Sequence, residues 1–301
     1  MKKLLKWLGL AIAGLIGLLI VAVVIVYVIS SSRINQTYAV PVDAIAIPAD
    51  EAAIARGEHI AATRGCADCH GENLGGAVMI DEFPVGLFYA TNLTAGPGGV
   101  GATYSDEDWV RALRHGLGPD GKPLLFMPSH EFYYLSDEDL GALIAYLKTV
   151  PPVDNPPTES SVGPLARVLF LAGQFPLLPA ELIDHTAPRP TVPAPGVTAE
   201  YGQYLAVGCT GCHGENGAGG PIPGGPPDWP PAANLTPTGN LANWTEAEFI
   251  STLRTGVTPE GHELKAEYMP WPTIGRLTDD ELKALWLYLK TLPAPAMASS
   301  N

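Results

Sequence analysis

Apolar and polar positions divide the chain into an N-terminal apolar segment and two similar stretches of amphipathic helix. From Trp7 to Ile29 there are 23 residues without a charge, enough for a helix of about 34 Å that crosses a hydrocarbon core. A cleaved signal peptide has a shorter apolar run, and no convincing small-x-small cleavage site follows here. A buried core helix of this length would be unusual at an N-terminus. The pattern therefore predicts an uncleaved transmembrane anchor over residues 1–33.

Helical periodicity recurs in two matched sets along the rest of the chain. Each set predicts three helices: one over EAAIARGEHIAA or AEYGQYLAVG, one that runs from a Ser/Thr capping box to a glycine, and one that begins at a further capping box. The last helix of each set carries apolar residues at positions i, i+3, i+4 and i+7: Leu140, Leu143, Ile144 and Leu147, and then Leu282, Leu285, Trp286 and Leu289. Between the helices we expect loops, and hence an all-α fold.

The two sets are copies of one internal repeat. Cys66 corresponds to Cys209 and Met127 to Met269, at offsets of 143 and 142 residues. A connector that is proline-rich at both ends separates the copies and contains the apolar segment GPLARVLFLAGQFPLL. We expect this segment to pack between the two domains rather than to lie at the membrane surface. The predicted boundaries are 1–33 for the anchor, 50–150 for domain 1, 151–197 for the connector and 198–294 for domain 2.

Charge gives the expected orientation of the chain. Lys2, Lys3 and Lys6 precede the apolar run, so the positive-inside rule places the N-terminus in the cytoplasm and the remainder outside. The formal net charge is −14, and because four of the 17 basic residues lie in residues 1–33, residues 34–301 carry −18. Such a surface argues against nucleic acid as a partner and against docking flat on anionic lipid. Residues 34–49 would form a tether that reaches about 50 Å when extended.

Candidate chemistry is concentrated in two copies of one motif, CADCH at residues 66–70 and CTGCH at residues 209–213, which hold all four cysteines. A Cys-x-x-Cys pair serves as a redox dithiol, as half a zinc site or as an attachment point for haem c. A dithiol does not need the following histidine, and zinc would need a second cysteine pair about 15–20 residues away. Here 139 residues separate the pairs. We therefore expect two covalently bound haem c groups, attached to Cys66, Cys69, Cys209 and Cys212, with His70 and His213 as proximal iron ligands.

Each iron would also have a sixth position. Met127 and Met269 are the only methionines that correspond between the repeats, and a proline follows each. A buried methionine usually only fills a core, but the matched positions favour thioether ligands, which raise haem potential. The expected metal ligands are therefore His70, Met127, His213 and Met269. The other histidines are not shared between the repeats, so we expect surface or capping roles for them.

Two further residue pairs recur in the repeats. Arg114 and Arg254 could contact a haem propionate, or each could be an exposed residue that the dipole favours at a helix C-terminus. The second interpretation is preferred. Asn92 and Asn234 each open an Asn-Leu-Thr sequence. Their matched placement after the cysteine motifs indicates a loop of the haem pocket rather than glycosylation.

Together these motifs resemble the class I cytochrome c family, and more closely the multihaem cytochrome subunits of membrane-bound alcohol, aldehyde and gluconate dehydrogenases. The similarity rests on CxxCH, the NLT loop, the helix that begins SDED, the Met-Pro pair and LSDEDLGALIAYLKTVPP, and it covers nearly all of residues 50–293. It implies two tandem class I cytochrome c domains. It also implies packing of the helix with Gly57 or Gly202 against the helix with Tyr146 or Tyr288. The chain departs from those subunits in having two cysteine motifs rather than three, and an N-terminal anchor.

The expected function is electron transfer by a membrane-anchored dihaem cytochrome c in a respiratory or photosynthetic chain, either on its own or as the electron-transfer subunit of a larger complex. Its domains would lie on the periplasmic side of a bacterial cytoplasmic membrane, between redox protein partners that include a membrane complex. The first haem would face an integral partner and the second a peripheral one. No small-molecule substrate is required, and we do not expect an enzyme.

Two other functions were weighed against electron transfer. A dihaem peroxidase would need one iron with an open sixth site, which the two matched methionines disfavour. A haem-based sensor would need an output module, for which residues 294–301 leave no room.

Overall fold

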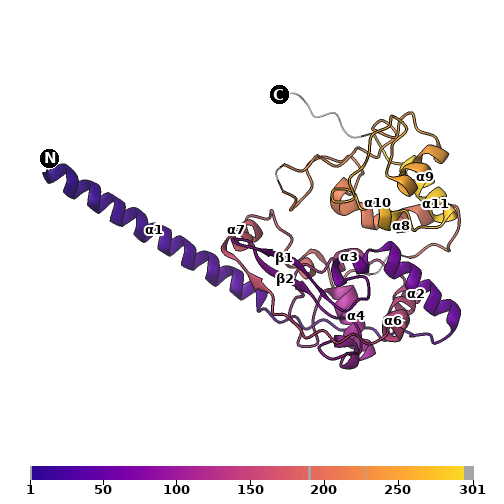
Figure 1. Cartoon of the computed structure of the whole chain (residues 1–301), viewed down its shortest axis with the longest axis horizontal. Helices are drawn as coiled ribbons and strands as arrows, with labels where there is room; N and C mark the ends of the chain where they lie inside the picture. The colour runs from indigo at the N-terminus through magenta and orange to yellow at the C-terminus, as the bar shows by residue number, and fades with distance from the viewer. Residues whose placement is uncertain (1, 189–190, 227, 295–301) are drawn as a thin grey trace.

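The computed structural model describes residues 2–188, 191–226 and 228–294. Helix α1 (Lys2–Ile34) projects from one side of the first repeat (Figure 1). The second repeat lies above the first in this view. The apolar stretch of α1 is 0% buried, so α1 is not the core helix of a soluble domain. Within the described ranges it is the one helix that is long and apolar enough to cross a membrane.

Both repeats are mainly helical, as predicted. The first contains α2 (Glu51–Thr63), α3 (Cys66–His70), the short 3-10 helix η1 (Val100–Ala102), α4 (Asp106–His115), α5 (Ser129–Phe132) and α6 (Asp137–Thr149). The second contains α8 (Ala199–His213), α9 (Glu246–Thr255), α10 (Trp271–Ile274) and α11 (Asp279–Leu289). The predicted N-terminal caps of four helices accept hydrogen bonds from the first turn: Ser105, Ser136, Thr245 and Thr278.

In each repeat the first and last helices cross at a glycine. A Cβ added to Gly57 would lie 2.8 Å from the Cβ of Tyr146, and one added to Gly202 would lie 2.8 Å from the Cβ of Tyr288. Each added Cβ would come still closer to a backbone carbonyl of the facing helix, that of Ala142 for Gly57 and that of Ala284 for Gly202. The helices therefore meet backbone to backbone, and both copies have the packing that the resemblance implies.

A small antiparallel sheet follows α3, so the all-α prediction is wrong in this part of the chain. Its strands are β1 (Ala77–Glu82), β2 (Gly86–Ala90) and β3 (Ser161–Val162), in the order β1-β2-β3. The corresponding stretch of the second repeat, residues 221–231, holds six prolines. Proline has no backbone N–H to donate to a neighbouring strand. Among the described residues of this stretch, the isolated bridge between Gly220 and Ala232 is the only strand pairing.

The connector packs elsewhere than predicted. Its helix α7 (Pro164–Leu171) lies against α1 and the sheet, where Phe170 joins a buried apolar cluster with Phe88 and Phe175. It does not lie between the two repeats. One face of the hairpin is apolar and needs cover, and α7 supplies it together with Phe175, Leu177 and Leu178, which lead into the 3-10 helix η2 (Pro179–Leu182).

Residues 34–49 do not form a free tether. The backbone N–H of Tyr38 donates to the carbonyl of Gly121 at 2.9 Å. Farther along, Val42, Ile45 and Ile47 pack on the core of the first repeat. The first repeat is therefore attached directly to the end of α1.

Replacement of Gly57 or Gly202 by alanine tests the helix crossings. Each added Cβ overlaps the backbone of the facing helix, so we expect each variant to lose about 1–3 kcal/mol of unfolding free energy or more. Gly196→Ala is the matched control, because a Cβ there meets no atom within 4 Å. Urea unfolding followed by circular dichroism measures the effect. Equal stability of all three variants would contradict the close crossing.

Candidate haem sites

The two motif histidines have the same environment. His70 Nδ1 lies 2.7 Å from the carbonyl oxygen of Thr91, and His213 Nδ1 lies 2.8 Å from that of Ala233. Because a carbonyl only accepts, the proton must sit on Nδ1, which leaves the Nε2 lone pair available. Neither Nε2 forms a hydrogen bond to another residue of the described chain. Burial lowers the pKa of both imidazoles, and the neutral tautomer is the form that binds a metal.

Sequence reasoning missed the two carbonyls that orient these rings, although it singled out the asparagines beside them. Asn92 Oδ1 accepts from the backbone N–H of Thr94 at 2.9 Å, while Asn92 Nδ2 donates to the carbonyl of Val153 at 2.9 Å. Asn92 is fully buried. It therefore shapes a turn and is not an acceptor for glycosylation.

The second repeat has the same turn. Asn234 Oδ1 accepts from the backbone N–H of Thr236 at 2.9 Å. In both copies the residue just before the asparagine supplies the carbonyl that binds the histidine. The matched Asn-Leu-Thr sequences indicate that the same loop recurs in both repeats. They do not indicate which backbone carbonyl of that loop accepts the hydrogen bond from the histidine.

None of the four cysteines forms a disulfide bond. Burial raises the pKa of Cys66 to about 12 and that of Cys209 to about 11. A reactive dithiol has a lowered thiol pKa, so these values argue against a redox dithiol. No group of three or more His, Cys, Asp or Glu side chains within residues 2–188, 191–226 and 228–294 is arranged to hold a metal ion.

The two predicted methionine ligands occupy matched loops. The carbonyl of Met127 accepts from the N–H of Ser129 at 2.7 Å, and that of Met269 accepts from the N–H of Trp271 at 2.6 Å. Each methionine is half-buried against the core of its own repeat. The proline after each one is the N-cap of a short helix, α5 or α10.

One buried donor fits a group that carries carboxylates. Trp109 on α4 is almost fully buried, and its Nε1–H has no hydrogen-bond partner among the described residues. A buried indole N–H normally finds an acceptor. The propionates of a haem would supply one, so the residues present in the first repeat fit this cofactor.

Arg114 and Arg254 each pair with an aspartate at the start of the last helix of their repeat. The preferred interpretation, an exposed residue at a helix C-terminus, fits Arg254 but not Arg114. Arg114 Nη2 lies 3.1 Å from the carbonyl of Leu135 and 3.0 Å from Asp137 Oδ1. Arg254 Nη2 lies 2.7 Å from Asp279 Oδ1. Each arginine thus joins the end of one helix to the first turn of the last helix of its repeat. Arg114 is only 2% exposed, so the expected exposed position is wrong for it.

The expected surface or capping role is also wrong for His115. This residue is buried, and its Nδ1 lies 3.0 Å from Nδ1 of His185. Burial lowers the pKa of His115 to about 4, and the neighbouring His185 and Arg114 act in the same direction. His115 is therefore a neutral internal residue near neutral pH.

The two cysteine motifs meet at the contact between the repeats. Cys69 of the first and Cys209 of the second line one cavity of about 470 Å³. Glycines on α8 allow the close approach: a Cβ added to Gly211 would lie 3.1 Å from Glu131 Oε1. Burial raises the pKa of Glu131 to about 7, so this acid is only partly charged near neutral pH.

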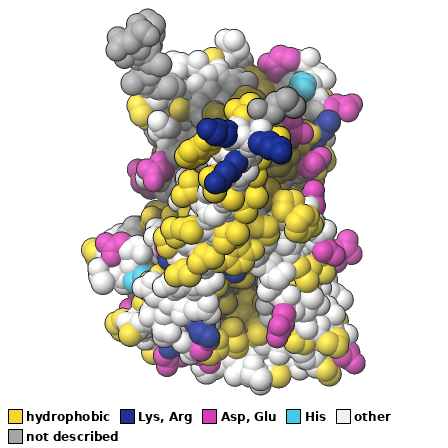
Figure 2. All heavy atoms as spheres, turned by 90° about the vertical axis from the view of Figure 1, so that its left-hand side faces the viewer, with side chains coloured by type: hydrophobic (Ala, Val, Ile, Leu, Met, Phe, Trp, Pro, Cys, Tyr) yellow, Lys and Arg dark blue, Asp and Glu magenta, His cyan; other side chains and the backbone are white. Residues whose placement is uncertain are grey.

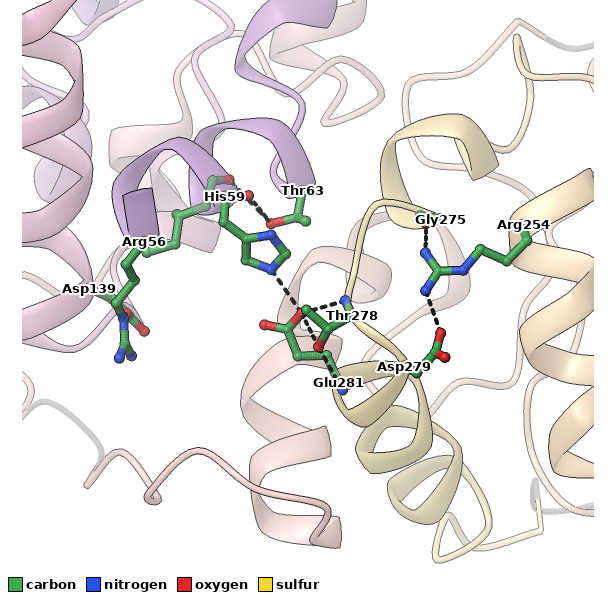
Figure 3. Close-up of polar contacts among 10 residues, drawn as sticks. Arg56, His59, Thr63, Asp139, Arg254, Gly275, Thr278, Asp279 and Glu281 are labelled. Atoms are coloured by element: carbon green, nitrogen blue, oxygen red, sulfur yellow. Dashed lines mark hydrogen bonds and ion pairs between the residues drawn. The ribbon is translucent and has the colours of Figure 1, made fainter. Parts of the chain in front are cut away.

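Polar contacts fix this arrangement. His59 on α2 reaches across to Glu281 at the start of α11, with 2.8 Å between Nε2 and Oε2 (Figure 3). Thr273 Oγ1 donates to Asp68 Oδ2 at 2.7 Å. The Nη1 group of Arg64 donates to the carbonyl of Leu205 at 3.4 Å. These contacts join both cysteine-bearing segments to the facing repeat.

Comparison with known proteins points the same way. A family model described as Cytochrome c matches residues 54–151 and 199–293. The cytochrome c subunit of the quinone alcohol dehydrogenase of Gluconacetobacter polyoxogenes is 31% identical over 283 residues, which cover 84% of this chain and 58% of that subunit. The fructose dehydrogenase cytochrome subunit of Gluconobacter japonicus is 28% identical, with coverage of 85% and 56%.

A protein of Cereibacter sphaeroides described as a dihaem cytochrome c-type protein is 28% identical over 271 residues, which cover 79% of this chain and 86% of that protein. Of the two dehydrogenase subunits, by contrast, the chain spans less than two thirds of the length. The family model matches more than half of the chain, so the predicted resemblance is confirmed: the chain belongs to the cytochrome c family, which carries covalently bound haem c.

Proposed function

We propose that this protein is a membrane-anchored dihaem cytochrome c that carries electrons between redox proteins outside the cytoplasm. Residues 50–150 and 198–294 would each form one class I cytochrome c domain, joined by the connector 151–197. The observation that carries the proposal is the matched histidine geometry. In both repeats an imidazole directly after a cysteine pair is held by Nδ1 and keeps Nε2 available.

The residues of each repeat would divide the work in the same way. Cys66 and Cys69, and likewise Cys209 and Cys212, would hold a haem through thioether bonds. The axial pairs would be His70 with Met127 and His213 with Met269. When bound, the haem supplies one-electron iron chemistry. The protein orients the imidazole, raises the potential through the thioether and excludes water through the apolar core around each methionine.

Electrons would also pass between the two haems of one chain. Supporting this, Cys69 and Cys209 line the same cavity, and the contacts of His59 and Thr273 hold the repeats together across it. These contacts would keep the two haem attachment sites at one interface.

The partners and the location belong to the same proposal. Several relatives are cytochrome subunits of dehydrogenases, which supports a membrane oxidoreductase complex as one redox partner. Helix α1 has the length and composition of a membrane span. Lys2, Lys3 and Lys6 support a cytoplasmic N-terminus, with both repeats on the periplasmic side of a bacterial membrane.

Replacement of the methionines tests the proposed ligation. Met127→Ala and Met269→Ala should each remove half of the near-infrared thioether–iron band of the oxidised protein and lower one of two haem potentials, because a weaker ligand replaces the thioether. Met79→Leu is the control, since Met79 lies on β1 and has no counterpart in the second repeat. An unchanged band and potential in either alanine variant would remove that residue from the ligand set.

A measurement on the wild-type protein separates electron transfer from peroxidase activity. In membranes of the native host, respiratory substrates should reduce both haems and oxygen should reoxidise them. Rapid peroxide turnover by the pre-reduced wild-type protein, without such cycling, would contradict the proposal and support a peroxidase.

The contact between the repeats should depend on pH. The hydrogen bond to Glu281 raises the pKa of His59 above its ordinary 6.5, so its contribution is complete below pH 6.5 and is lost as pH rises through the raised value. Burial alone would raise the pKa of Glu281, but hydrogen bonds from His59 and Thr278 lower it below 4.5. Its contribution is therefore lost only as pH falls below that value. The contact is strongest between these limits.

The measurement compares unfolding free energies of wild type and His59→Gln. We expect a difference of about 0.5–1 kcal/mol at pH 5.5 that shrinks at pH 9. His262→Gln is the control, because the exposed His262 lies away from this contact. A difference that stays constant from pH 5.5 to pH 9 would show that the ion pair does not contribute.

A further inference from the structure

Exposed apolar side chains surround the place where α1 joins the first repeat. They come from three separate segments: the tip of the β1-β2 hairpin, helix α7 and the end of η2. The α1-proximal patch consists of Phe83, Leu165, Val168 and Leu182, which are 88%, 39%, 49% and 60% exposed. Isolated apolar residues are common on protein surfaces, but a group from three segments around one point needs an explanation.

Backbone hydrogen bonds fix the first two segments to each other. The N–H of Leu165 donates to the carbonyl of Pro84 at 3.1 Å, and the N–H of Gly163 donates to the carbonyl of Val85 at 2.8 Å. The start of α7 is therefore bound to the hairpin tip that carries Phe83. The two segments that carry Phe83 and Leu165 are thus joined through their backbones.

The same surface is bound to the end of α1. Arg167 Nη1 on α7 donates to Ser30 Oγ at 2.7 Å and to Ser31 Oγ at 2.9 Å, and its guanidinium lies over the ring of Tyr27. The apolar run of α1 ends at Ile29, directly before these serines. The patch therefore lies at the level where a membrane span would leave the hydrocarbon core.

A second cation anchors the remaining segment. Arg33 pairs with Glu181, with 3.0 Å between Nε and Oε1, and its guanidinium stacks over the ring of Phe170 at 4.0 Å. Leu182 directly follows Glu181. With α1 across a bilayer, Arg33 and Arg167 would lie at the depth of the lipid headgroups, with apolar side chains beside them.

Seen from the side on which it projects, α1 points toward the viewer, and hydrophobic side chains fill much of the middle of the view (Figure 2). The exposed apolar side chains of α1 thus lead to the end of the helix at which the α1-proximal patch lies.

We propose that the α1-proximal patch inserts into the interfacial layer of the same bilayer that α1 spans, so that the first repeat rests on the membrane. This inference rests on the proposed membrane anchoring of α1. The bilayer is the occupant because the span ends at the level of the patch and lipid adjoins that point all around the helix. Asp81 and Glu82 are exposed beside Phe83, so the contact is apolar and favours zwitterionic over anionic lipid.

Photolabelling of the full-length holoprotein tests the contact. The probe is phosphatidylcholine with a diazirine in its acyl chain, used in phosphatidylcholine vesicles and in native membranes, and mass spectrometry locates the labels. We expect labelling of the patch at least about fivefold above that of Val257 and Leu287. These controls are 40% and 38% exposed and lie in the second repeat. Phe83→Asp should reduce labelling of the hairpin tip at least about threefold, whereas Val257→Asp should not.

The labels on α1 separate failure of the patch from failure of the anchor. If α1 is labelled but the patch stays at the control level, the patch proposal is wrong and the anchor stands. If α1 is unlabelled, the anchoring itself is wrong and the patch proposal falls with it. Labelling in phosphatidylcholine vesicles but not in native membranes would overturn lipid as the occupant in favour of a membrane protein.

Discussion

One hydrogen bond, from imidazole Nδ1 to a backbone carbonyl, determines what each repeat can do. It fixes both the tautomer and the direction of the ring, so that Nε2 is left as the atom able to bind iron. In the first repeat the carbonyl belongs to a turn that Asn92 ties to Val153 at the start of the connector. The orientation of a single ring thus depends on residues more than 80 positions apart in the chain.

The meeting of the repeats follows from helix packing. The apolar core of the first repeat includes Tyr201, Tyr204 and Ala284 from the second, although the second repeat also has a core of its own. Tyr204 also donates its hydroxyl hydrogen to Asp139. Because α8 carries both these tyrosines and the second cysteine pair, packing of its face against the first repeat also brings the two proposed haem attachments to one interface.

Local patterns predicted the parts of the fold that depend on local physics. The capping residues Ser105 and Thr245 begin helices as expected, and the recurrence of Gly57 and Gly202 agreed with the close crossings that the resemblance implied. The cysteine motif, its histidine and the asparagine turn were all visible as matched spacing.

What failed depended on distant partners. The hairpin, the docking of α7 on α1 and the packing of residues 34–49 all result from apolar faces that need cover, and periodicity does not name the element that provides it. Likewise Arg114 and His115 are buried because of Asp137 and His185, which lie 23 and 70 positions away. The carbonyls that bind the histidines were missed because a sequence shows side chains, not backbone direction.

The central claim is that each repeat carries its own covalently attached haem. Mass spectrometry of the intact chain under denaturing conditions tests it most directly, because only thioether-bound haem survives unfolding. The account predicts a mass that exceeds that of the polypeptide by two haems, and by one haem after replacement of Cys209 and Cys212 with alanine. A wild-type mass with one haem or none would contradict it.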